Sequence, residues 1–214
     1  MKVVAFIPIK LNSQRLPNKN ILPVGDKPLC RHIMDTLLAC KNIDELFVYC
    51  SDVSIKKYMP SRGITFLKRD SRLDGNKVKG MEIYSEFVKE IDADIYVLVH
   101  TTSPFVTQQS IDSAIDLVKS GKYDSAFSVQ ELKTFVWYKG HPLNYNLTDI
   151  PRTQDIEPVF VETSGFYIFT KEVIRDRRRI GDNPYPCVVT SMEAIDIDDE
   201  DDYVLACLHS KMDV

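Results

Sequence analysis

The feature that most constrains this chain is a short apolar run at its start that ends abruptly in a positively charged segment. Residues 3–9 (VVAFIPI) are all apolar, and residues 10–20 (KLNSQRLPNKN) carry three cations, Lys10, Arg15 and Lys19, without a carboxylate. A run of this kind is typical of a strand covered on both faces of a parallel sheet. Open α/β sheets bind ligands in the loops at the carboxyl ends of their strands. The pattern therefore predicts a buried first strand that ends in an anion-binding loop.

The first two-thirds of the chain alternate strand and helix patterns. Further apolar, β-branched runs occur at 45–50, 64–67, 94–100 and 125–129. Helical periodicity lies between them and is clearest over 111–118, a segment entered through Thr107 and closed by Gly121. This alternation predicts an α/β fold with a doubly wound, mostly parallel sheet. We expect one domain over residues 1–214, with a final helix over 199–212 whose acidic first turn suits the helix dipole.

Periodicity weakens between about residues 130 and 165. Aromatic residues, among them Trp137, Tyr138, Tyr145 and Phe160, stand there among several prolines. Two interpretations remain open, a β-rich excursion from the sheet and a long irregular lid. Because exposed aromatic side chains suit a protein interface, we expect this segment to mediate a homodimer.

Bulk properties exclude several classes of partner. The net charge of −4 argues against a nucleic-acid-binding face, and the apolar runs are too short for a membrane span or a signal peptide. The five cysteines form no C-x-x-C pair, which makes a zinc site or a disulfide framework unexpected. We therefore expect reduced thiols in a cytoplasmic protein without nucleic-acid or membrane partners.

The charged loop has the groups that a triphosphate requires. Asn12 and Ser13 are loop donors, and Arg15 and Lys19 are cations that can offset charge on leaving phosphates. No G-x-x-x-x-G-K-[ST] or G-x-G-x-x-G motif occurs, which removes the usual P-loop and dinucleotide interpretations. A surface turn with solvated charges explains the loop equally well from spacing alone.

A second candidate site lies near the other end of the chain. Residues 194–198 (AIDID) alternate apolar and acidic residues, so in a strand Asp196 and Asp198 would share one face. Mg²⁺ is commonly held by one or two carboxylates together with substrate phosphates. The alternative is that these acids cap the last helix, which explains residues 199–202 well but Asp196 poorly. We therefore predict that Asp196 and Asp198 bind Mg²⁺.

A third segment, 100–104 (HTTSP), follows a strong strand pattern and should face the ligand crevice. Its hydroxyl groups could bind a base or a sugar, although a plain strand-to-helix turn is equally consistent with the residues. His100 taken alone is more often a satisfied core histidine than a catalyst.

Together these motifs resemble the cytidylyltransferase family that activates acidic sugars, the CMP-sialic acid and CMP-Kdo synthetases. The first loop combines the patterns of two branches, A-R-x-N/G-S-K-x-x-P-x-K-N of the sialic acid branch and S-x-R-L-P-x-K of the Kdo branch. It departs from the first pattern at two positions, where Lys10 replaces the Arg and Gln14 replaces a phosphate-binding Lys. Five later segments are similar to further motifs of the family. Residues 69–76 are similar to R-P-x-x-L-x-x-D, residues 100–104 to Q-P-T-S-P and residues 152–154 to R-x-Q. Residues 164–168 are similar to N-G-A-x-Y-I, and residues 196–198 are identical to D-I-D. His100, Ser164 and Phe166 depart from the family's Gln, Asn and Ala.

The resemblance implies a nucleotide-diphospho-sugar transferase-like fold with a β-rich dimerisation excursion, and a transfer of CMP from CTP to an acidic 3-deoxy sugar. Lys19, Arg15 and Asp198 would then be catalytic, and Mg²⁺ would be bound by Asp196 and Asp198. Nucleotide-binding residues would be Lys10, Asn12, Ser13, Asn20, Arg69 and Ser103. Acceptor-binding residues would be His100, Gln154 and Ser164.

Two other functions stay open. One is a cytidylyltransferase with a different acceptor, such as a phosphonate or a sugar phosphate. The other is a nucleotide-binding protein that has lost catalysis, which the departures at Lys10 and Gln14 favour and the intact Lys19, Asp196 and Asp198 oppose.

Overall fold

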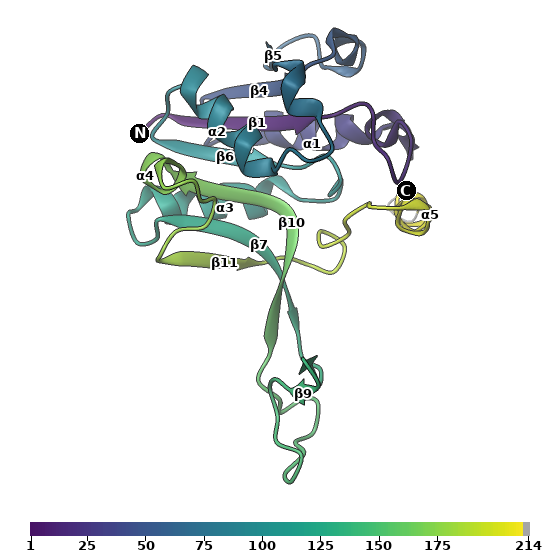
Figure 1. Ribbon diagram of the computed structural model, residues 1–214, viewed down its shortest axis with the longest axis vertical. Coiled ribbons are helices and arrows are strands. Elements are labelled where there is room, and N and C mark those ends of the chain that lie inside the picture. The colour runs from purple at the N-terminus through teal and green to yellow at the C-terminus, as the bar shows by residue number, and fades with distance from the viewer. Residues whose placement is uncertain (212–214) are drawn as a thin grey trace.

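A mixed seven-stranded sheet forms the centre of the molecule, in the order β11-β7-β10-β6-β1-β4-β5 (Figure 1). The computed structural model describes residues 1–211. Strand β10 is antiparallel to both of its neighbours, while the other pairs in the sheet are parallel. The sheet strands are β1 (Val3–Ile9), β4 (Glu45–Cys50), β5 (Thr65–Lys68), β6 (Ile95–Val99), β7 (Ser125–Leu132), β10 (Val159–Thr170) and β11 (Pro184–Val188).

The apolar composition of β1 follows from its central place between β4 and β6. Val3, Ala5 and Ile7 pack into a core on one face of the sheet, whereas Val4 and Phe6 pack into a second core on the other face. Strands with two covered faces need apolar residues at every position, not at alternate ones. This confirms the prediction of a buried first strand and a doubly wound, mostly parallel sheet.

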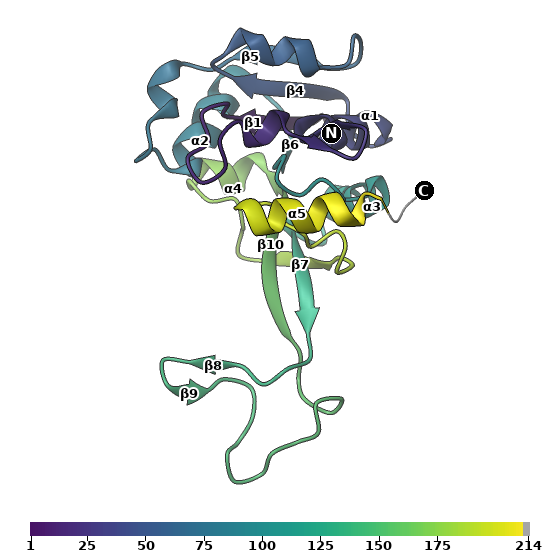
Figure 2. The same ribbon diagram turned by 90° about the vertical axis from the view of Figure 1, so that its right-hand side faces the viewer.

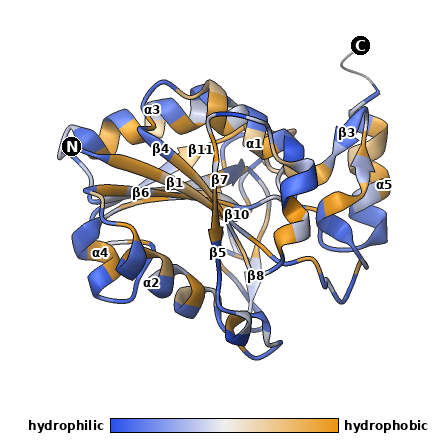
Figure 3. Ribbon diagram, turned by 90° about the horizontal axis from the view of Figure 1, so that it is seen from above, coloured by the Kyte–Doolittle hydropathy of each residue, from blue (hydrophilic) through white to orange (hydrophobic). Residues whose placement is uncertain are grey.

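Helices cover both faces of the sheet, with α1 and α3 on one side and α2 and α4 on the other (Figure 3). The helices are α1 (Leu29–Ala39), α2 (Gly80–Glu90), α3 (Gln108–Lys119), α4 (Lys171–Arg175) and α5 (Glu200–His209). Three 3-10 turns span Lys19–Ile21, Val53–Tyr58 and Ser71–Asp74, and two short strands, β2 (Pro23–Val24) and β3 (Lys27–Pro28), pair with each other. No helix within residues 1–211 is both long and apolar enough to span a membrane.

Three helix boundaries agree with their sequence signals, both ends of α3 and the start of α5. The Thr107 side chain accepts a hydrogen bond from the Ser110 N–H at the start of α3, and Gly121 adopts a φ of 74° just past its end. Asp199 caps α5 through a reciprocal capping box with Asp202. The start of the final helix is therefore confirmed, while Met212, included in the expected helix, lies outside the described residues.

The segment from 130 to 165 forms an arm that projects from the body (Figure 2). Strands β7 and β10 continue beyond the sheet as a paired ribbon, and a small hairpin of β8 (Trp137–Tyr138) and β9 (His141–Pro142) lies farther out. The base of the arm is therefore a paired β ribbon, its outer part between residues 133 and 158 is mostly irregular chain, and the arm does not close over the body as a lid. Its exposed apolar side chains include Phe135, Trp137, Tyr138, Leu143, Leu147, Ile150 and Phe160.

Candidate active site

The positively charged first loop and the acidic segment before α5 meet at one edge of the sheet. The Arg15 guanidinium donates to Asp198 Oδ1 at 2.7 Å, although these residues are 183 positions apart. The Lys19 ammonium lies 3.5 Å from the same oxygen and donates to the Ile197 carbonyl at 2.5 Å. The two groups expected to converge on one ligand therefore lie in direct contact.

A cavity of about 280 Å³ opens where these segments meet. Three kinds of group surround it: cations and donors of the first loop, the Asp198 carboxylate, and a mainly apolar wall from residues 73–83. The predicted site residues that line it are Lys10, Asn12, Ser13, Arg15, Lys19 and Asp198. Such a cavity suits a polyphosphate attached to a flat aromatic base, whose face can pack on an apolar wall. Asn76, which sequence reasoning did not single out, accepts a hydrogen bond from Lys10 Nζ at 3.1 Å.

Asn20 lies one layer below the cavity and ties the first loop to the end of β6. Its amide nitrogen donates to the Lys10 carbonyl at 2.6 Å, and its amide oxygen accepts from the Thr101 hydroxyl at 2.5 Å. Asn18, at the start of the 3-10 turn, has a φ of 58°, a conformation that asparagine adopts more readily than most residues. These bonds position Lys19, whose side chain is almost entirely buried.

Arg69 is buried under the same edge of the sheet. Its guanidinium donates to the Ile9 carbonyl at 3.0 Å and to Asp74 Oδ1 at 2.7 Å, with a longer bond of 3.4 Å to the Tyr49 carbonyl. Arg69 thus joins the ends of β1 and β4 to the turn that forms one wall of the cavity. The residue does not line the cavity itself, and its geometry is that of a positioning group.

The segment with Asp196 and Asp198 differs from the predicted strand, because residues 195–198 form irregular chain that pairs with no strand within residues 1–211. The main-chain bond from Ile197 N–H to the Thr102 carbonyl, at 2.8 Å, anchors it to the loop after β6, and Ile197 is fully buried. Asp196 Oδ1 is buried and has no hydrogen-bond partner within residues 1–211. Burial raises the pKa of the Asp196 carboxyl, and the nearby Asp198 charge raises it further.

His100 joins two segments on the other side of Asn20 and Thr101. Its Nδ1 lies 2.7 Å from the Ser164 carbonyl, and its Nε2 lies 3.0 Å from the Tyr84 hydroxyl. A carbonyl can only accept, so Nδ1 carries the proton and Nε2 of the neutral ring accepts from Tyr84. Burial lowers the pKa of His100 to about 4, and the positive charges of Arg179 and Lys19 act in the same direction. His100 is therefore a neutral imidazole whose two nitrogens are already bonded.

Ser164 holds its main chain in a left-handed conformation with a φ of 59°, at an irregularity in the pairing of β10 with β7. The next residue, Gly165, packs so closely that an added Cβ would lie 2.9 Å from Val106 Cγ2. Ser103 is fully buried against this glycine, and its hydroxyl has no partner among the described residues. Ser103 therefore lies behind the site and does not line the nucleotide cavity.

Four residues of this region were missed by sequence reasoning: Tyr84, Glu162, Tyr167 and Arg179. The Arg179 guanidinium stacks on the Tyr167 ring at 3.9 Å, and both side chains bond to Glu162 Oε2, Tyr167 at 2.6 Å and Arg179 at 3.4 Å. The sequence offered one signal for these residues, since Tyr167 belongs to the segment that resembles N-G-A-x-Y-I. Arg179 could not be found in this way, because it lies in a loop after α4 that matches no motif.

Gln154, the third predicted acceptor-binding residue, does not lie near His100 and Ser164 in this chain. It lies in the arm, beyond the last paired residues of the ribbon, whereas His100 pairs with the base of β10 through the Gly165 carbonyl. Within one chain, the structure therefore groups His100 and Ser164 but leaves Gln154 apart from them.

A family model and individual relatives both relate this chain to the same family of proteins. A sequence model described as cytidylyltransferase matches residues 4–179. The N-acylneuraminate cytidylyltransferase of Streptococcus agalactiae is 24% identical over 215 residues, covering 95% of this chain and 52% of that protein. The CMP-N,N'-diacetyllegionaminic acid synthase of Legionella pneumophila is 27% identical, covering 96% of this chain and 94% of that protein. The chain thus spans about half the length of the first curated relatives it matches and nearly the whole of a shorter one.

Solved structures share the fold at low sequence identity. A CMP:2-keto-3-deoxy-manno-octonic acid synthetase complexed with CTP aligns over 100% of both chains with a TM-score of 0.75 and 13% identity. A 4-diphosphocytidyl-2C-methyl-D-erythritol synthase from Anaerococcus prevotii covers 98% of this chain, with a TM-score of 0.70 and 12% identity. The nucleotide-diphospho-sugar transferase-like fold is therefore confirmed, and the family match over residues 4–179 shows that this chain belongs to the cytidylyltransferase family.

Proposed function

We propose that this protein transfers CMP from CTP to an acidic 3-deoxy sugar and releases pyrophosphate. The observation that carries the proposal is the contact of Arg15 and Lys19 with Asp198 at the wall of one cavity. Membership of the cytidylyltransferase family supports the nucleotide and the reaction type. Relatives named for N-acylneuraminate, 3-deoxy-manno-octulosonate and diacetyllegionaminic acid support the class of acceptor.

In this reaction an acceptor hydroxyl forms a bond to the α-phosphorus while the bond from that phosphorus to the bridging oxygen breaks. The negative charge gained by the departing pyrophosphate is offset by Arg15 and Lys19, with Asn12 and Ser13 as neighbouring donors. Lys19 suits this task because its ammonium is already fixed by the Ile197 carbonyl and needs little reorganisation. Catalysis by the protein is then mainly positioning and electrostatics, without a covalent intermediate.

The residues present fit a divalent cation of the Mg²⁺ type at Asp196 and Asp198. Asp196 has a buried carboxylate oxygen without a partner, which a hard cation would satisfy. Within residues 1–211 no group of three or more potential ligand side chains occurs, so the remaining ligands would be phosphate oxygens and water. Such an ion would supply Lewis-acid polarisation of the α-phosphate and a template for the two substrates.

The acceptor would lie beside His100 and Ser164. Both nitrogens of the neutral His100 are already bonded, so His100 would act by positioning Ser164 and Tyr84. The Tyr84 hydroxyl oxygen can still accept a hydrogen bond, and the Arg179 guanidinium offers one cation for the acceptor carboxylate. Arg179 is held by Tyr167 and Glu162 in the same group, so its position is set before the acceptor binds.

We also infer that two copies of the chain pair through the arm. Its exposed aromatic and aliphatic side chains would be covered in such a homodimer. Gln154, which lies on the arm, could then reach an acceptor only in the site of the second copy. A reaction that consumes CTP, together with five free cysteines, favours a cytoplasmic location.

The proposal is tested by measuring pyrophosphate release from CTP with a panel of acceptors. The panel contains N-acetylneuraminate, 3-deoxy-manno-octulosonate, diacetyllegionaminate, a sugar phosphate and a phosphonate. We expect release with at least one of the three acidic sugars, dependent on Mg²⁺ and absent with ATP. Release only with the phosphate or phosphonate would change the acceptor class, and binding of CTP without release for any acceptor would favour a non-catalytic nucleotide-binding protein.

A further inference from the structure

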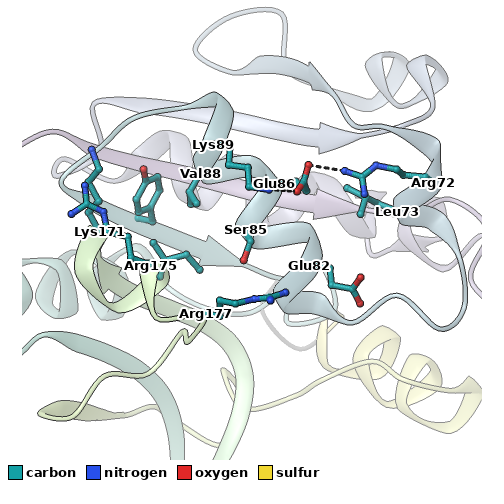
Figure 4. Close-up of a pocket in the computed structure, with 12 residues that line it drawn as sticks. Arg72, Leu73, Glu82, Ser85, Glu86, Val88, Lys89, Lys171, Arg175 and Arg177 are labelled. Atoms are coloured by element: carbon teal, nitrogen blue, oxygen red, sulfur yellow. Dashed lines mark hydrogen bonds and ion pairs between the residues drawn. The ribbon is translucent and has the colours of Figure 1, made fainter.

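Glu193 is a buried carboxylate to which the proposed reaction gives no role. The residue is only 4% exposed and lies three positions before Asp196. A carboxylate that is shielded from water is usually paired with a cation. Figure 4 shows this usual arrangement beside a cavity of about 540 Å³ between α2 and α4, where Glu86 lies between Arg72 and Lys89. Glu193 differs, because within residues 1–211 every group that donates to its carboxylate is uncharged.

The two oxygens of the Glu193 carboxylate accept hydrogen bonds from two different segments. Oε1 accepts from the Thr107 N–H at 3.0 Å, the Thr107 hydroxyl at 2.8 Å and the Ser110 hydroxyl at 2.7 Å, all at the start of α3. Oε2 accepts from the N–H and the hydroxyl of Thr190, both at 3.1 Å. The carboxylate thus joins the chain just after β11 to the first turn of α3, where the helix dipole also favours a negative charge.

A local role explains only one of these oxygens. Residues 190–193 (TSME) match the capping-box pattern S/T-x-x-E, and the Glu193 N–H donates back to the Thr190 hydroxyl at 3.2 Å. In a capping box the glutamate bonds within its own turn. The turn at residues 190–194 leads into irregular chain at 195–198, not into a helix. The three bonds from Oε1 to α3 therefore serve a contact between distant segments.

The bonding pattern requires an ionised carboxylate at this position. Each oxygen faces a main-chain N–H, of Thr107 at Oε1 and of Thr190 at Oε2, and such a group can only donate. Burial raises the pKa of Glu193, but the hydrogen bonds from Ser110, Thr190 and Thr107 outweigh this effect and hold the pKa below its ordinary value. A glutamine would have one acceptor oxygen and would set its NH₂ group against one of the two main-chain donors.

Asp196 lies between two anchors of the same segment. Three residues before it, Glu193 bonds to Thr107, and one residue after it, the Ile197 N–H donates to the Thr102 carbonyl at 2.8 Å. Thr102 and Thr107 belong to the one loop that connects β6 to α3. The two anchors therefore fix the main chain on both sides of Asp196, although this stretch has no helix or strand of its own.

We propose that Glu193 is a positioning residue for the cation site at Asp196 and Asp198. Its ionised carboxylate ties residues 190–198 to the start of α3 and so keeps both aspartates at the edge of the sheet where Arg15 and Lys19 lie. Glu193 acts through the main chain and does not line the nucleotide cavity. The inference rests on the proposed function, because it concerns the cation site of that reaction.

The first test is hydrogen–deuterium exchange, measured by mass spectrometry without nucleotide or metal. In Glu193→Gln, peptides that cover residues 190–199 should exchange on the order of tenfold faster than in the wild type, because a buried charged group loses at least one hydrogen bond. Val118→Ala is the matched control. Val118 is buried at the opposite end of α3, so its truncation destabilises the protein but should leave exchange at 190–199 unchanged.

A second variant covers the case in which Glu193→Gln does not fold. Ser110→Ala removes one hydroxyl donor to Oε1 and leaves the charge and the turn at residues 190–194 in place. It should accelerate exchange in the same peptides by a smaller factor, about two- to fivefold.

The second test measures pyrophosphate release from CTP at varied concentrations of free Mg²⁺. Glu193→Gln should raise the Mg²⁺ concentration for half-maximal rate roughly tenfold, because groups that hold metal ligands in place affect metal affinity to this extent. KM for the acceptor should stay at the wild-type value. Val118→Ala should leave both quantities unchanged, since a loss of packing alone does not reach the cation site.

Two outcomes would overturn the inference. One is wild-type exchange at residues 190–199 in both Glu193→Gln and Ser110→Ala. The other is a Mg²⁺ requirement that does not change in Glu193→Gln or that rises equally in Val118→Ala, which would leave Glu193 with a purely structural role. A wild-type protein that releases no pyrophosphate with any acceptor would instead contradict the proposed function, and the exchange data would still decide whether Glu193 holds the segment.

Discussion

The neutral state of His100 leads to a specific dependence of stability on pH. An unfolded histidine takes up a proton near its ordinary pKa of 6.5, whereas burial lowers the pKa of His100 in the folded protein to about 4. Between these values the unfolded chain binds a proton that the folded chain does not bind. The free energy of unfolding must therefore fall as the pH is lowered from about 7 to about 4.

The pKa difference gives an upper limit of about 3 kcal/mol for this loss. The His100 residue is only half-buried, so solvent screening should reduce the loss to about 1–2 kcal/mol. The substitution His100→Gln keeps a hydrogen-bonding side chain near Ser164 and Tyr84 but removes the titration. We expect the variant to lose correspondingly less stability than the wild type over this pH range.

The assay is urea denaturation of the wild type, His100→Gln and His141→Gln at pH 8 and pH 5. His141 lies exposed in the arm, so its replacement controls for the simple loss of one histidine. The wild type and the His141 variant should lose stability in parallel on acidification, and the His100 variant should lose less. Parallel loss in all three proteins would refute the argument that a half-buried, neutral His100 resists protonation.

Other predictions concern the two sides of the site. Asp198→Ala should abolish Mg²⁺-dependent pyrophosphate release while circular dichroism remains unchanged; wild-type rates would exclude the metal assignment. Lys19→Ala should lower turnover by a factor on the order of 10², by analogy with the loss of one oxyanion donor, and an unchanged rate would remove Lys19 from catalysis. Arg179→Gln should raise KM for the acidic acceptor several-fold and leave KM for CTP unchanged; equal changes in both would indicate a structural role. Gly165→Ala should destabilise the fold by about 1–3 kcal/mol in thermal unfolding, because the new Cβ would lie 2.9 Å from Val106 Cγ2, and an unchanged melting temperature would contradict that packing.

The sheet could be predicted because its signals are local. The run at residues 3–9 is apolar at every position, and the structure buries it between β4 and β6 with helices on both faces. The start of α5 was equally readable, since acidic residues and a capping box occur at its first turn. Each of these features depends on residues that are close together in the chain.

The prediction was wrong where a segment took its conformation from distant contacts. Alternation of apolar and acidic residues at 194–198 predicted a strand, yet none of the strands described between residues 1 and 211 lies beside this segment as a partner. Ile197 is buried by packing with Val24 and Leu29, and one bond to the Thr102 carbonyl holds the main chain. The side-chain pattern was informative about burial, but a strand also requires a partner along its edge.

Arg69 and Asn20 show a further limit of prediction from sequence, because a polar side chain near a site can form its hydrogen bonds with the protein and not with a ligand. A motif marks both residues as polar groups near the nucleotide, but it does not say whether their hydrogen bonds go to a ligand or to the protein. In the folded chain their groups bond to Ile9, Tyr49 and Lys10 carbonyls and to neighbouring side chains.

The position of the first loop depends on these internal bonds. Asn20 connects the loop to Thr101 after β6, Thr102 is bonded in turn to Ile197, and the Ile197 carbonyl receives the Lys19 ammonium. This network of hydrogen bonds joins three segments: the first loop, the loop after β6 and the segment before α5. Because the network lies beneath the cavity, the cation and the carboxylate next to it are fixed by the fold before any nucleotide arrives. A site fixed in this way would need little reorganisation to receive the negative charge of a triphosphate, so we expect the polar residues below the cavity to affect a reaction that they do not touch.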